Sequence, residues 1–154
     1  MLSKIFISNS EFETFSLGEK FGSLIKNLNS GLIVLMYGDL GSGKTVFVRG
    51  VGKSLNAHNI HSPSFTLINE HENISGKLLV HADLYRLDQN SVSSIGLDDY
   101  TDDFLFIEWA ERLNFDLSDN VVKIFFETFN LNSRAIKIIS ENQNLEFNTL
   151  FQNL

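Results

Sequence analysis

The sequence contains no cysteine, and this absence excludes several kinds of site at once. Disulfide bonds, zinc sites built from thiolates and catalysis by a thiol all require cysteine side chains. Proline occurs once in the 154 residues, so neither a proline-rich linker nor a disordered chain is indicated. With 43% hydrophobic and 20% charged residues, the composition is that of an ordinary globular domain with one core.

Long hydrophobic runs are also missing. The longest uninterrupted apolar run covers residues 32–37, far short of the roughly 20 residues that cross a bilayer. Residues 8–13 carry polar and charged side chains where a secretory signal would need its apolar core. We therefore expect a soluble, cytoplasmic protein with no membrane partner.

Basic residues are few relative to acidic ones. The chain has 12 Lys and Arg against 19 Asp and Glu, which gives a formal net charge of −7. Because contacts to phosphates dominate the affinity for DNA and RNA, a protein that binds them by itself needs a basic face. We do not expect this chain to bind nucleic acid directly, although its net charge leaves room for a local basic patch.

Hydrophobic periodicity predicts alternating strands and helices. Ser10 and Glu13 have the spacing of a capping box, which begins a helix whose apolar residues recur every three or four positions up to residues 29–31. The apolar run 32–37 is bounded by glycines, as expected of a strand buried on both faces, and residues 44–55 form the next helix. The remaining expected segments are strands at 4–7, 65–72, 77–83, 104–107, 121–128 and 135–140, and a helical turn within 91–100.

Two pairs of these strands are expected to form hairpins. A short polar break separates strand 65–72 from strand 77–83, and an Asn-rich turn separates 121–128 from 135–140. The last dozen residues show little pattern, and neither an internal repeat nor a long linker is present. We therefore expect residues 1–154 to form one α/β domain, with a partly parallel central sheet and additional antiparallel strands.

One motif stands out, because residues 38–45 (Gly-Asp-Leu-Gly-Ser-Gly-Lys-Thr) fit the P-loop pattern G-x-x-x-x-G-K-[ST]. Glycines let backbone N–H groups turn towards phosphate oxygens, and the helix that follows adds the positive end of its dipole. In this pattern Lys44 supplies a positive charge for the β- and γ-phosphates, and Thr45 supplies a hydroxyl ligand for Mg²⁺. A glycine-rich turn that only caps a helix is the alternative, but the strand before the motif and the helix after it favour a phosphate site.

The motif predicts a fold of the P-loop NTPase type, a three-layer sandwich that binds a nucleotide together with Mg²⁺. The chain lacks the Asn-Lys-x-Asp element expected of a guanine-specific GTPase, so ATP is the expected nucleotide. The residues expected to contact it are Asp39, Leu40, Gly41, Ser42, Gly43, Lys44, Thr45 and Val46.

Two carboxylates are candidates for the acidic partner of the P-loop. Asp83 and Glu108 each follow an apolar strand-like segment, which is the position expected of an acid near the P-loop strand. One could hold Mg²⁺, directly or through water, and the other could orient the attacking water. The residues alone leave this division open. Lys44, Asp83 and Glu108 are thus the expected catalytic residues, and Thr45, Glu108 and Asp83 the expected metal ligands.

Three histidines, His61, His71 and His81, form a second conceivable metal set. Their spacing spans a loop and two expected strands, and no cysteine supports them, so we interpret them as surface or packing residues. Trp109, next to Glu108, could be a stacking group or part of the core, and the sequence does not decide between the two.

Five segments have a distinctive order and spacing: GDLGSGKT at 38–45, SPSFTLINEH at 62–71, HADLYRL at 81–87, IGLDDY at 95–100 and IEWAER at 107–112. In this order they resemble the bacterial TsaE (YjeE) family of small P-loop ATPases, which take part in making threonylcarbamoyladenosine on tRNA. The resemblance covers about residues 10–140. It rests on all five segments, since the P-loop alone would not identify the family.

The resemblance implies roles for matching positions. Thr45 and Glu108 would be the Mg²⁺ ligands, and Asp83 would lie beside them and could polarise water. Residues 62–66 would be a switch-like segment that faces the γ-phosphate. Two further residues would border the nucleotide, Ser10 and Arg134.

Two positions depart from the family pattern. Ala110 stands where the family often has proline after the Glu-Trp pair, and the freer backbone bears on the pose of Glu111. Ser64 stands where the family commonly has threonine, but serine keeps the hydroxyl group.

The resemblance also implies a slow ATPase that acts with two partner proteins, TsaB and TsaD, which carry out the transfer to tRNA. This subunit would reach tRNA only through them and would use hydrolysis to cycle their complex, with fast hydrolysis only in the complex. Two alternatives stay open, a small P-loop kinase and a nucleotide-sensing adaptor that does not hydrolyse ATP. The kinase would need arginines that clamp phosphates, and a lid, whereas the four arginines here are spread widely and the chain has little length for a lid.

Overall fold

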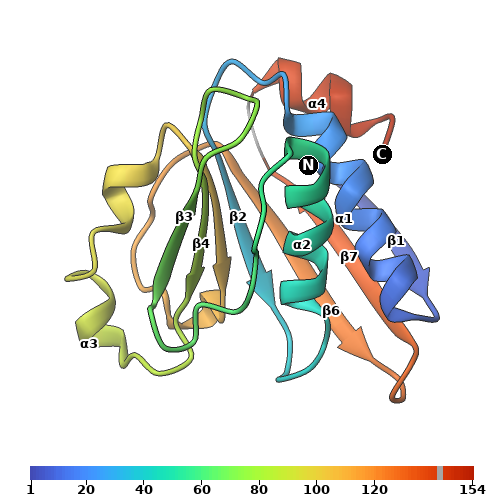
Figure 1. Cartoon of the computed structure of the whole chain (residues 1–154), viewed down its shortest axis with the longest axis horizontal. Helices are drawn as coiled ribbons and strands as arrows, with labels where there is room; N and C mark the ends of the chain where they lie inside the picture. The colour runs from blue at the N-terminus through green and yellow to red at the C-terminus, as the bar shows by residue number, and fades with distance from the viewer. Residues whose placement is uncertain (142–143) are drawn as a thin grey trace.

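A mixed sheet of seven strands runs through the molecule in the order β1-β7-β6-β2-β5-β4-β3 (Figure 1). The computed structural model describes residues 1–141 and 144–154. The strands are β1 (Leu2–Ser8), β2 (Leu32–Tyr37), β3 (Ile68–His71), β4 (Leu79–Asp83), β5 (Phe104–Glu108), β6 (Val121–Thr128) and β7 (Arg134–Ser140). The helices are α1 (Glu11–Ile25), α2 (Lys44–Leu55), α3 (Gln89–Val92) and α4 (Leu145–Phe151), with the 3₁₀ helices η1 (Leu97–Tyr100) and η2 (Ala110–Arg112).

The centre of the sheet is parallel and its margins are antiparallel. Strands β6, β2, β5 and β4 run in the same direction, whereas β7, β1 and β3 each run against their neighbours. Both expected hairpins are present, since β3 pairs with β4 and β6 pairs with β7. The prediction of a partly parallel sheet with added antiparallel strands is therefore confirmed.

Helices α1, α2 and α4 cover one face of the sheet (Figure 1). The apolar spacing of the first helix buries Leu17, Phe21 and Ile25 against this face. The ring of Phe21 lies 5.5 Å from that of Phe47 in α2 and 6.4 Å from that of Phe147 in α4, measured between centroids. Aromatic pairs at such distances add to the stabilisation from burial alone, so Phe21 joins the three helices into one layer.

The helices α1 and α2 approach closely because each presents glycine to the other. A Cβ added to Gly18 of α1 would lie 2.1 Å from the carbonyl oxygen of Phe47, and one added to Gly50 of α2 would lie 2.0 Å from that of Phe15. No real side chain fits at these distances, so only glycine allows the two backbones to meet here. The position of α2 relative to the sheet depends on this contact.

The opposite face of the sheet carries a second core under short helices and loops. The apolar residues that point to this side from β2, β4 and β5 pack against α3, η1 and η2. They include Ile33, Val80 and Leu105, each 1% exposed or less. This layer is the third of the predicted sandwich, and it is built from short pieces instead of long helices.

Two segments differ from the sequence prediction. The strand expected from residue 65 begins only at Ile68, because Pro63 to Leu67 form a turn in which the Leu67 N–H donates to the carbonyl of Pro63 at 2.7 Å. The chain end, which had no clear pattern, contains the short helix α4. Asn144 caps this helix and Phe147 and Phe151 anchor it, a signal too short for periodicity to detect.

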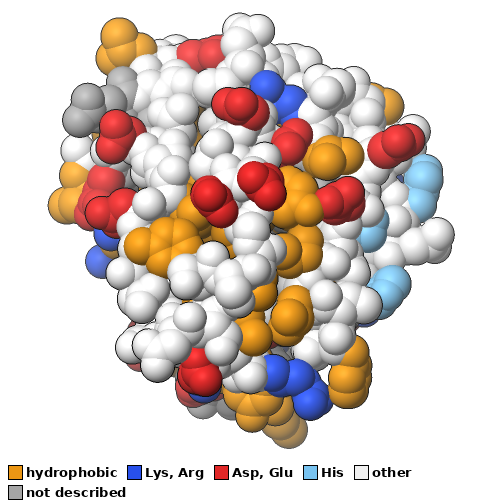
Figure 2. All heavy atoms as spheres, turned by 90° about the vertical axis from the view of Figure 1, so that its left-hand side faces the viewer, with side chains coloured by type: hydrophobic (Ala, Val, Ile, Leu, Met, Phe, Trp, Pro, Cys, Tyr) orange, Lys and Arg blue, Asp and Glu red, His pale blue; other side chains and the backbone are white. Residues whose placement is uncertain are grey.

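Figure 2 shows the side of the molecule that carries β3, α3 and η1. Asp and Glu side chains gather over its upper half and histidines lie on its right, and few basic side chains accompany them. Three histidines, His58, His61 and His71, line one depression with residues of β3. Within residues 1–141 and 144–154, no helix has both the length and the hydropathy needed to cross a membrane.

The close contact of α1 and α2 predicts that replacing a glycine of α2 by alanine lowers the stability of the protein instead of raising it. Glycine to alanine in a helix normally stabilises by roughly 1 kcal/mol, but Gly50→Ala is expected to destabilise by about 1–3 kcal/mol, as overpacking does. Lys53→Ala, on the exposed side of α2, should change the free energy of unfolding by less than about 0.5 kcal/mol. Urea unfolding of both variants measures this, and a stabilised Gly50→Ala would contradict the packing described.

Candidate functional site: a cleft at the carboxyl ends of the parallel strands

The candidate site is a cleft where β2, β5 and β4 end at the same edge of the sheet, at the bottom of Figure 1. In α/β proteins this edge is the usual place for ligands, because loops that leave the strands diverge there. The cleft has a volume of about 380 Å³. It is lined by Glu11, Leu40, Gly41, Ser42, Gly43, Lys44, Thr45, Val46, Ser62, Ser64, Asp83, Tyr85, Glu108, Trp109, Leu131, Asn132 and Arg134.

The predicted P-loop forms one wall of this cleft. It leaves β2 at Tyr37 and enters α2 at Lys44, with Gly43 as the residue before the helix. Gly43 has a φ of 105°, a conformation that favours glycine, and a Cβ there would lie 2.7 Å from Nη1 of Arg134. No side chain caps this end of α2. Its first-turn N–H groups and the positive end of the helix dipole therefore remain open to an anion.

The ammonium group of Lys44 is folded back into the loop. Its Nζ donates to the carbonyl oxygens of Gly38 at 2.6 Å and Asp39 at 2.9 Å, and lies 4.6 Å from the ring centroid of Trp109. Burial lowers the pKa of Lys44, and the carboxylate of Glu108 opposes this shift. Lys44 thus holds a desolvated positive charge at the floor of the cleft.

The carboxylate of Glu108 lies beside Lys44 and is hydrogen-bonded from two sides. Its Oε1 accepts from the hydroxyl of Thr45 at 2.6 Å and lies 2.8 Å from Nε2 of His81. Burial by itself would raise the pKa of Glu108, but the hydrogen bond and charge of His81, the bond from Thr45 and the charge of Lys44 outweigh it and lower the pKa. Glu108 is therefore held as an anion although it is only 4% exposed.

Asp83 is the neighbour of Glu108 across the sheet, because these two residues are paired in the parallel register of β4 and β5. Its Oδ1 accepts from the N–H of Tyr85 at 2.8 Å, and its Oδ2 accepts from the hydroxyl of Ser64 at 3.0 Å. Ser62 lies slightly farther from Oδ2, at 3.5 Å. The predicted switch-like segment thus lies directly against the second carboxylate.

The oxygen donors of this cleft fit Mg²⁺. Thr45 offers a hydroxyl group and Glu108 and Asp83 offer carboxylates, and Mg²⁺ typically takes one or two carboxylates, water and phosphate oxygens instead of a complete protein cage. Among the residues that the structure describes, no three His, Cys, Asp or Glu side chains are placed to hold a metal ion by themselves. Of the three histidines considered from sequence, His61 is exposed and His81 is fully buried against Glu108.

Trp109 adopts a backbone conformation that non-glycine residues rarely have. Its φ is 58° and ψ is 44°, which is left-handed and costs free energy that other contacts must offset. The ring lies over the ammonium of Lys44 and is 4.8 Å from the ring of Tyr85, with the planes tilted by 42°. The two rings form an aromatic wall of the cleft, so Trp109 belongs to the site and is not simply part of the core.

Arg134 reaches the other end of the cleft from β7. It is only 6% exposed, its Nη1 lies 3.3 Å from the hydroxyl of Thr14, and its Nη2 lies 3.4 Å from the carbonyl of Asn132. Its Nε is buried with no hydrogen-bond partner. A guanidinium that lines the cleft beside Gly43 is suited to an anionic ligand.

Most of the predicted residues meet in this cleft, but two do not line it. Ser10 instead caps α1, and its hydroxyl accepts from the N–H of Glu13 at 3.1 Å. Asp39 has an exposed side chain and contributes its carbonyl oxygen to Lys44. Four further residues line the cleft that were not predicted from the sequence: Tyr85, which lies in the quoted segment 81–87, and Glu11, Leu131 and Asn132, which lie outside the quoted segments.

Comparison with known proteins identifies the family of this chain. The model of a family described as "Threonylcarbamoyl adenosine biosynthesis protein TsaE" matches residues 8–136. The chain belongs to the TsaE family. Its resemblance to that family and its three-layer α/β fold are thereby both confirmed.

Relatives that carry the name "tRNA threonylcarbamoyladenosine biosynthesis protein TsaE" align over most of the chain. The one from Nostoc sp. is 41% identical over 120 residues, which are 73% of this chain and 70% of the relative. The one from Rickettsia bellii is 32% identical over 145 residues, or 92% of this chain and 98% of the relative. The crystal structure of Bacillus subtilis YdiB superimposes with a TM-score of 0.75 over 99% of this chain and 93% of that one, at 23% identity. This likeness supports the fold.

The pKa shift of Glu108 predicts how stability depends on pH. Because the folded pKa lies below the ordinary value of 4.5, the ionised carboxylate stabilises the fold above that value, and this stabilisation is lost as the pH falls through the lowered pKa. Between about pH 6 and about pH 3, Glu108→Gln should therefore lose less stability than the wild type. Denaturant unfolding across this range measures the slopes, and Glu72→Gln, at an exposed glutamate, should keep the wild-type slope. Equal slopes for Glu108→Gln and the wild type would contradict the prediction.

Proposed function

We propose that this chain is a Mg²⁺-dependent ATP-binding and ATP-hydrolysing subunit of the cytoplasmic machinery that makes threonylcarbamoyladenosine on tRNA, with residues 1–154 acting as one ATPase domain. The observation that carries the proposal is the meeting of Lys44, Thr45 and Glu108 in one cleft at the start of α2. Membership of the TsaE family supports the biosynthetic role, since the family description names that pathway.

The P-loop is proposed to bind the phosphates through its backbone N–H groups and Lys44. When phosphate oxygens enter, they replace the carbonyls of Gly38 and Asp39 as partners of the Lys44 ammonium. This exchange needs little movement, because the ammonium already lies at the floor of the cleft. A positive charge in a water-poor site stabilises charge that develops on the γ-phosphoryl group more strongly than one in water.

Thr45 and Glu108 are proposed to hold Mg²⁺, and Asp83 lies beside them. Bound Mg²⁺ supplies electrostatic stabilisation of the phosphates and orients them. Asp83 has its hydroxyl contacts on Oδ2, on the side of the 62–66 segment. A carboxylate there can orient a water molecule towards the γ-phosphate, which gives Asp83 the water-positioning role and Glu108 the metal role.

Arg134 and the N-terminal end of α1 are proposed to border the rest of the nucleotide. Arg134 lines the cleft, and its guanidinium can donate to a phosphate oxygen. Glu11 lines the cleft and is the residue of α1 that borders the nucleotide. Ser10, which precedes it, caps the start of the helix. ATP is the proposed nucleotide, since the chain lacks the Asn-Lys-x-Asp element of guanine-specific proteins.

The 62–66 segment is proposed to couple hydrolysis to a complex of TsaB and TsaD type. Ser64 contacts Asp83, while Phe65 is 85% exposed and its ring lies 4.4 Å from the guanidinium carbon of Arg86. One short segment thus touches a site carboxylate on one side and faces solvent on the other. A partner that orders or shifts it changes the surroundings of Asp83 directly. This subunit reaches tRNA only through those partners, in keeping with its net charge of −7.

Phosphate release from ATP tests the proposal, measured with Mg²⁺ for the chain alone and with a TsaB–TsaD complex. We expect slow release alone, faster release with the partners, and loss of both in Lys44→Ala. Equal rates with and without the partners would contradict the coupling. ATP binding without release in either arm would favour a nucleotide-sensing adaptor, and phosphate transfer to a small acceptor would favour a kinase.

Arg134→Gln should weaken nucleotide binding by about tenfold or more, because a hydrogen bond between charged groups contributes about 1.5–3 kcal/mol. Arg112→Gln is the matched control, since Arg112 donates to the carbonyl of Leu87 and does not line the cleft. Titration with a fluorescent ATP analogue measures both affinities. Equal affinities in the two variants would remove Arg134 from the nucleotide site.

A further inference from the structure

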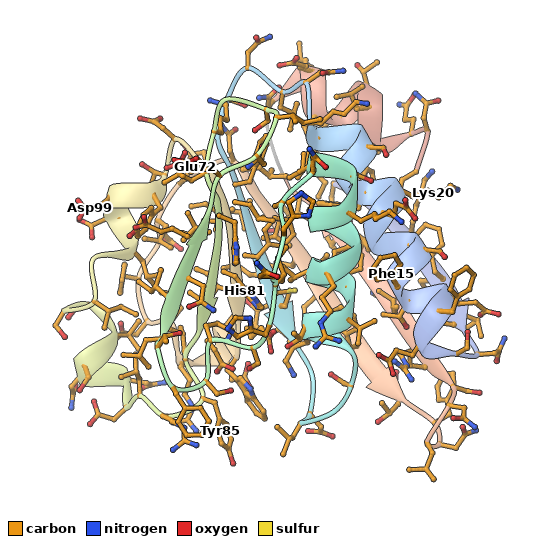
Figure 3. All side chains as sticks on the ribbon, in the orientation of Figure 1. Phe15, Lys20, Glu72, His81, Tyr85 and Asp99 are labelled. Carbon is orange, nitrogen blue, oxygen red and sulfur yellow. The ribbon has the colours of Figure 1, made fainter. Side chains whose placement is uncertain are left out.

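His81 is a fully buried histidine behind the cleft, and the proposed chemistry does not use it. It lies in the middle of β4 with 0% of its surface exposed. In Figure 3 it is in the interior between β4 and α2, whereas Tyr85 lies at the lower edge of the molecule. Side chains alternate along a strand, so His81 shares its face of the sheet with Leu79 and Asp83.

The register of β4 and β5 explains how His81 reaches Glu108. His81 is paired with Phe106, and Glu108 lies two residues farther along the same face of β5. Nε2 of His81 lies 2.8 Å from Oε1 of Glu108. An ionised carboxylate can only accept hydrogen bonds, so the N–H is on Nε2 of His81.

Among the described residues, the ring of His81 has one hydrogen bond, which it makes with Glu108. On this face Leu79 and Phe106 are apolar and fully buried, and Asn69 of β3 is paired with His81 across the sheet. The second ring nitrogen of His81, Nδ1, is buried and has no hydrogen-bond partner, which costs free energy. An apolar residue of similar size would avoid this cost, so the contact with Glu108 is what the histidine provides.

We propose that His81 is a positioning residue that orients the Glu108 carboxylate for Mg²⁺, through the hydrogen bond from its Nε2 to Oε1. This inference rests on the proposed function, because it assumes that Glu108 is a metal ligand. Thr45 bonds the same Oε1 and is itself a proposed ligand, so His81 is the donor that stands outside the ligand set. With both donors on Oε1, the carboxylate is fixed in rotation and Oε2 is left for the metal.

The role of His81 requires an N–H at the position of Nε2, and a polar group elsewhere on the side chain would not reach Glu108. Glutamine places its amide N–H close to the position of Nε2 in histidine, and asparagine places it close to that of Nδ1. His81→Gln should therefore retain the contact with Glu108, and His81→Asn and His81→Leu should lose it. His71→Asn is the matched control, because His71 is in the adjacent strand β3 with a buried Nε2 that has no partner and makes no contact with Glu108.

The measurement is the affinity for a fluorescent ATP analogue with saturating Mg²⁺ and with none, for each full-length variant. The dissociation constant without Mg²⁺, divided by the dissociation constant with saturating Mg²⁺, gives the gain in affinity that Mg²⁺ provides. Loss of a group that supports a metal ligand typically costs 10–100-fold in metal affinity, so His81→Asn and His81→Leu should reduce the ratio by about tenfold or more. His81→Gln and His71→Asn should stay within about threefold of the wild type, and the affinity without Mg²⁺ should be unchanged in all four.

Each outcome bears on one proposal at a time. A wild-type chain that gains no affinity from Mg²⁺ contradicts the proposed function itself. A normal gain that persists in His81→Asn, or an equal loss in His81→Gln and His81→Asn, overturns the role of His81 alone. An equal loss of affinity with and without Mg²⁺ shows general damage to the cleft and also overturns the role of His81. If His81→Leu fails to fold in circular dichroism, the comparison of glutamine with asparagine decides.

Discussion

The site depends on one buried carboxylate, that of Glu108. An anion removed from water must receive hydrogen bonds and positive charge, or it would be neutralised. Here a helix supplies the hydroxyl of Thr45, the neighbouring strand supplies His81, and the P-loop supplies the charge of Lys44. The requirements of one side chain thus tie together α2, β4 and β5.

These contacts are possible only because the backbone places their donors accurately. The parallel register of β4 and β5 sets His81 and Glu108 on the same face. The glycine contact between α1 and α2 lets α2 lie close to its neighbours. Since Lys44 and Thr45 are the first residues of α2, the packing of α1 against α2 also fixes the positions of these two side chains at the floor of the cleft.

The sequence predicts much of this fold because its central elements have strong signals. The apolar run of β2, the spacing of α1 and the P-loop pattern each depend on neighbours in sequence, and the structure contains all three. The hydrogen bond between His81 and Glu108 could not be predicted, because 27 residues separate the two and the register of parallel strands is set by tertiary packing. For the same reason Glu11, Tyr85, Leu131 and Asn132 were missed, since only the folded chain brings them to the cleft. The helix α4 was missed because seven residues carry too little periodicity.

The pairing of Asp83 with Glu108 across adjacent strands has a further consequence. Hydrogen bonds of the sheet hold the backbones of both acids in register, so this wall of the cleft is anchored in the sheet. The wall opposite Asp83 comes from Ser62 and Ser64, which belong to a turn outside any strand or helix. The cleft therefore has one wall anchored in the sheet and one wall formed by a turn, so a shift of the turn moves the two serines relative to the two acids.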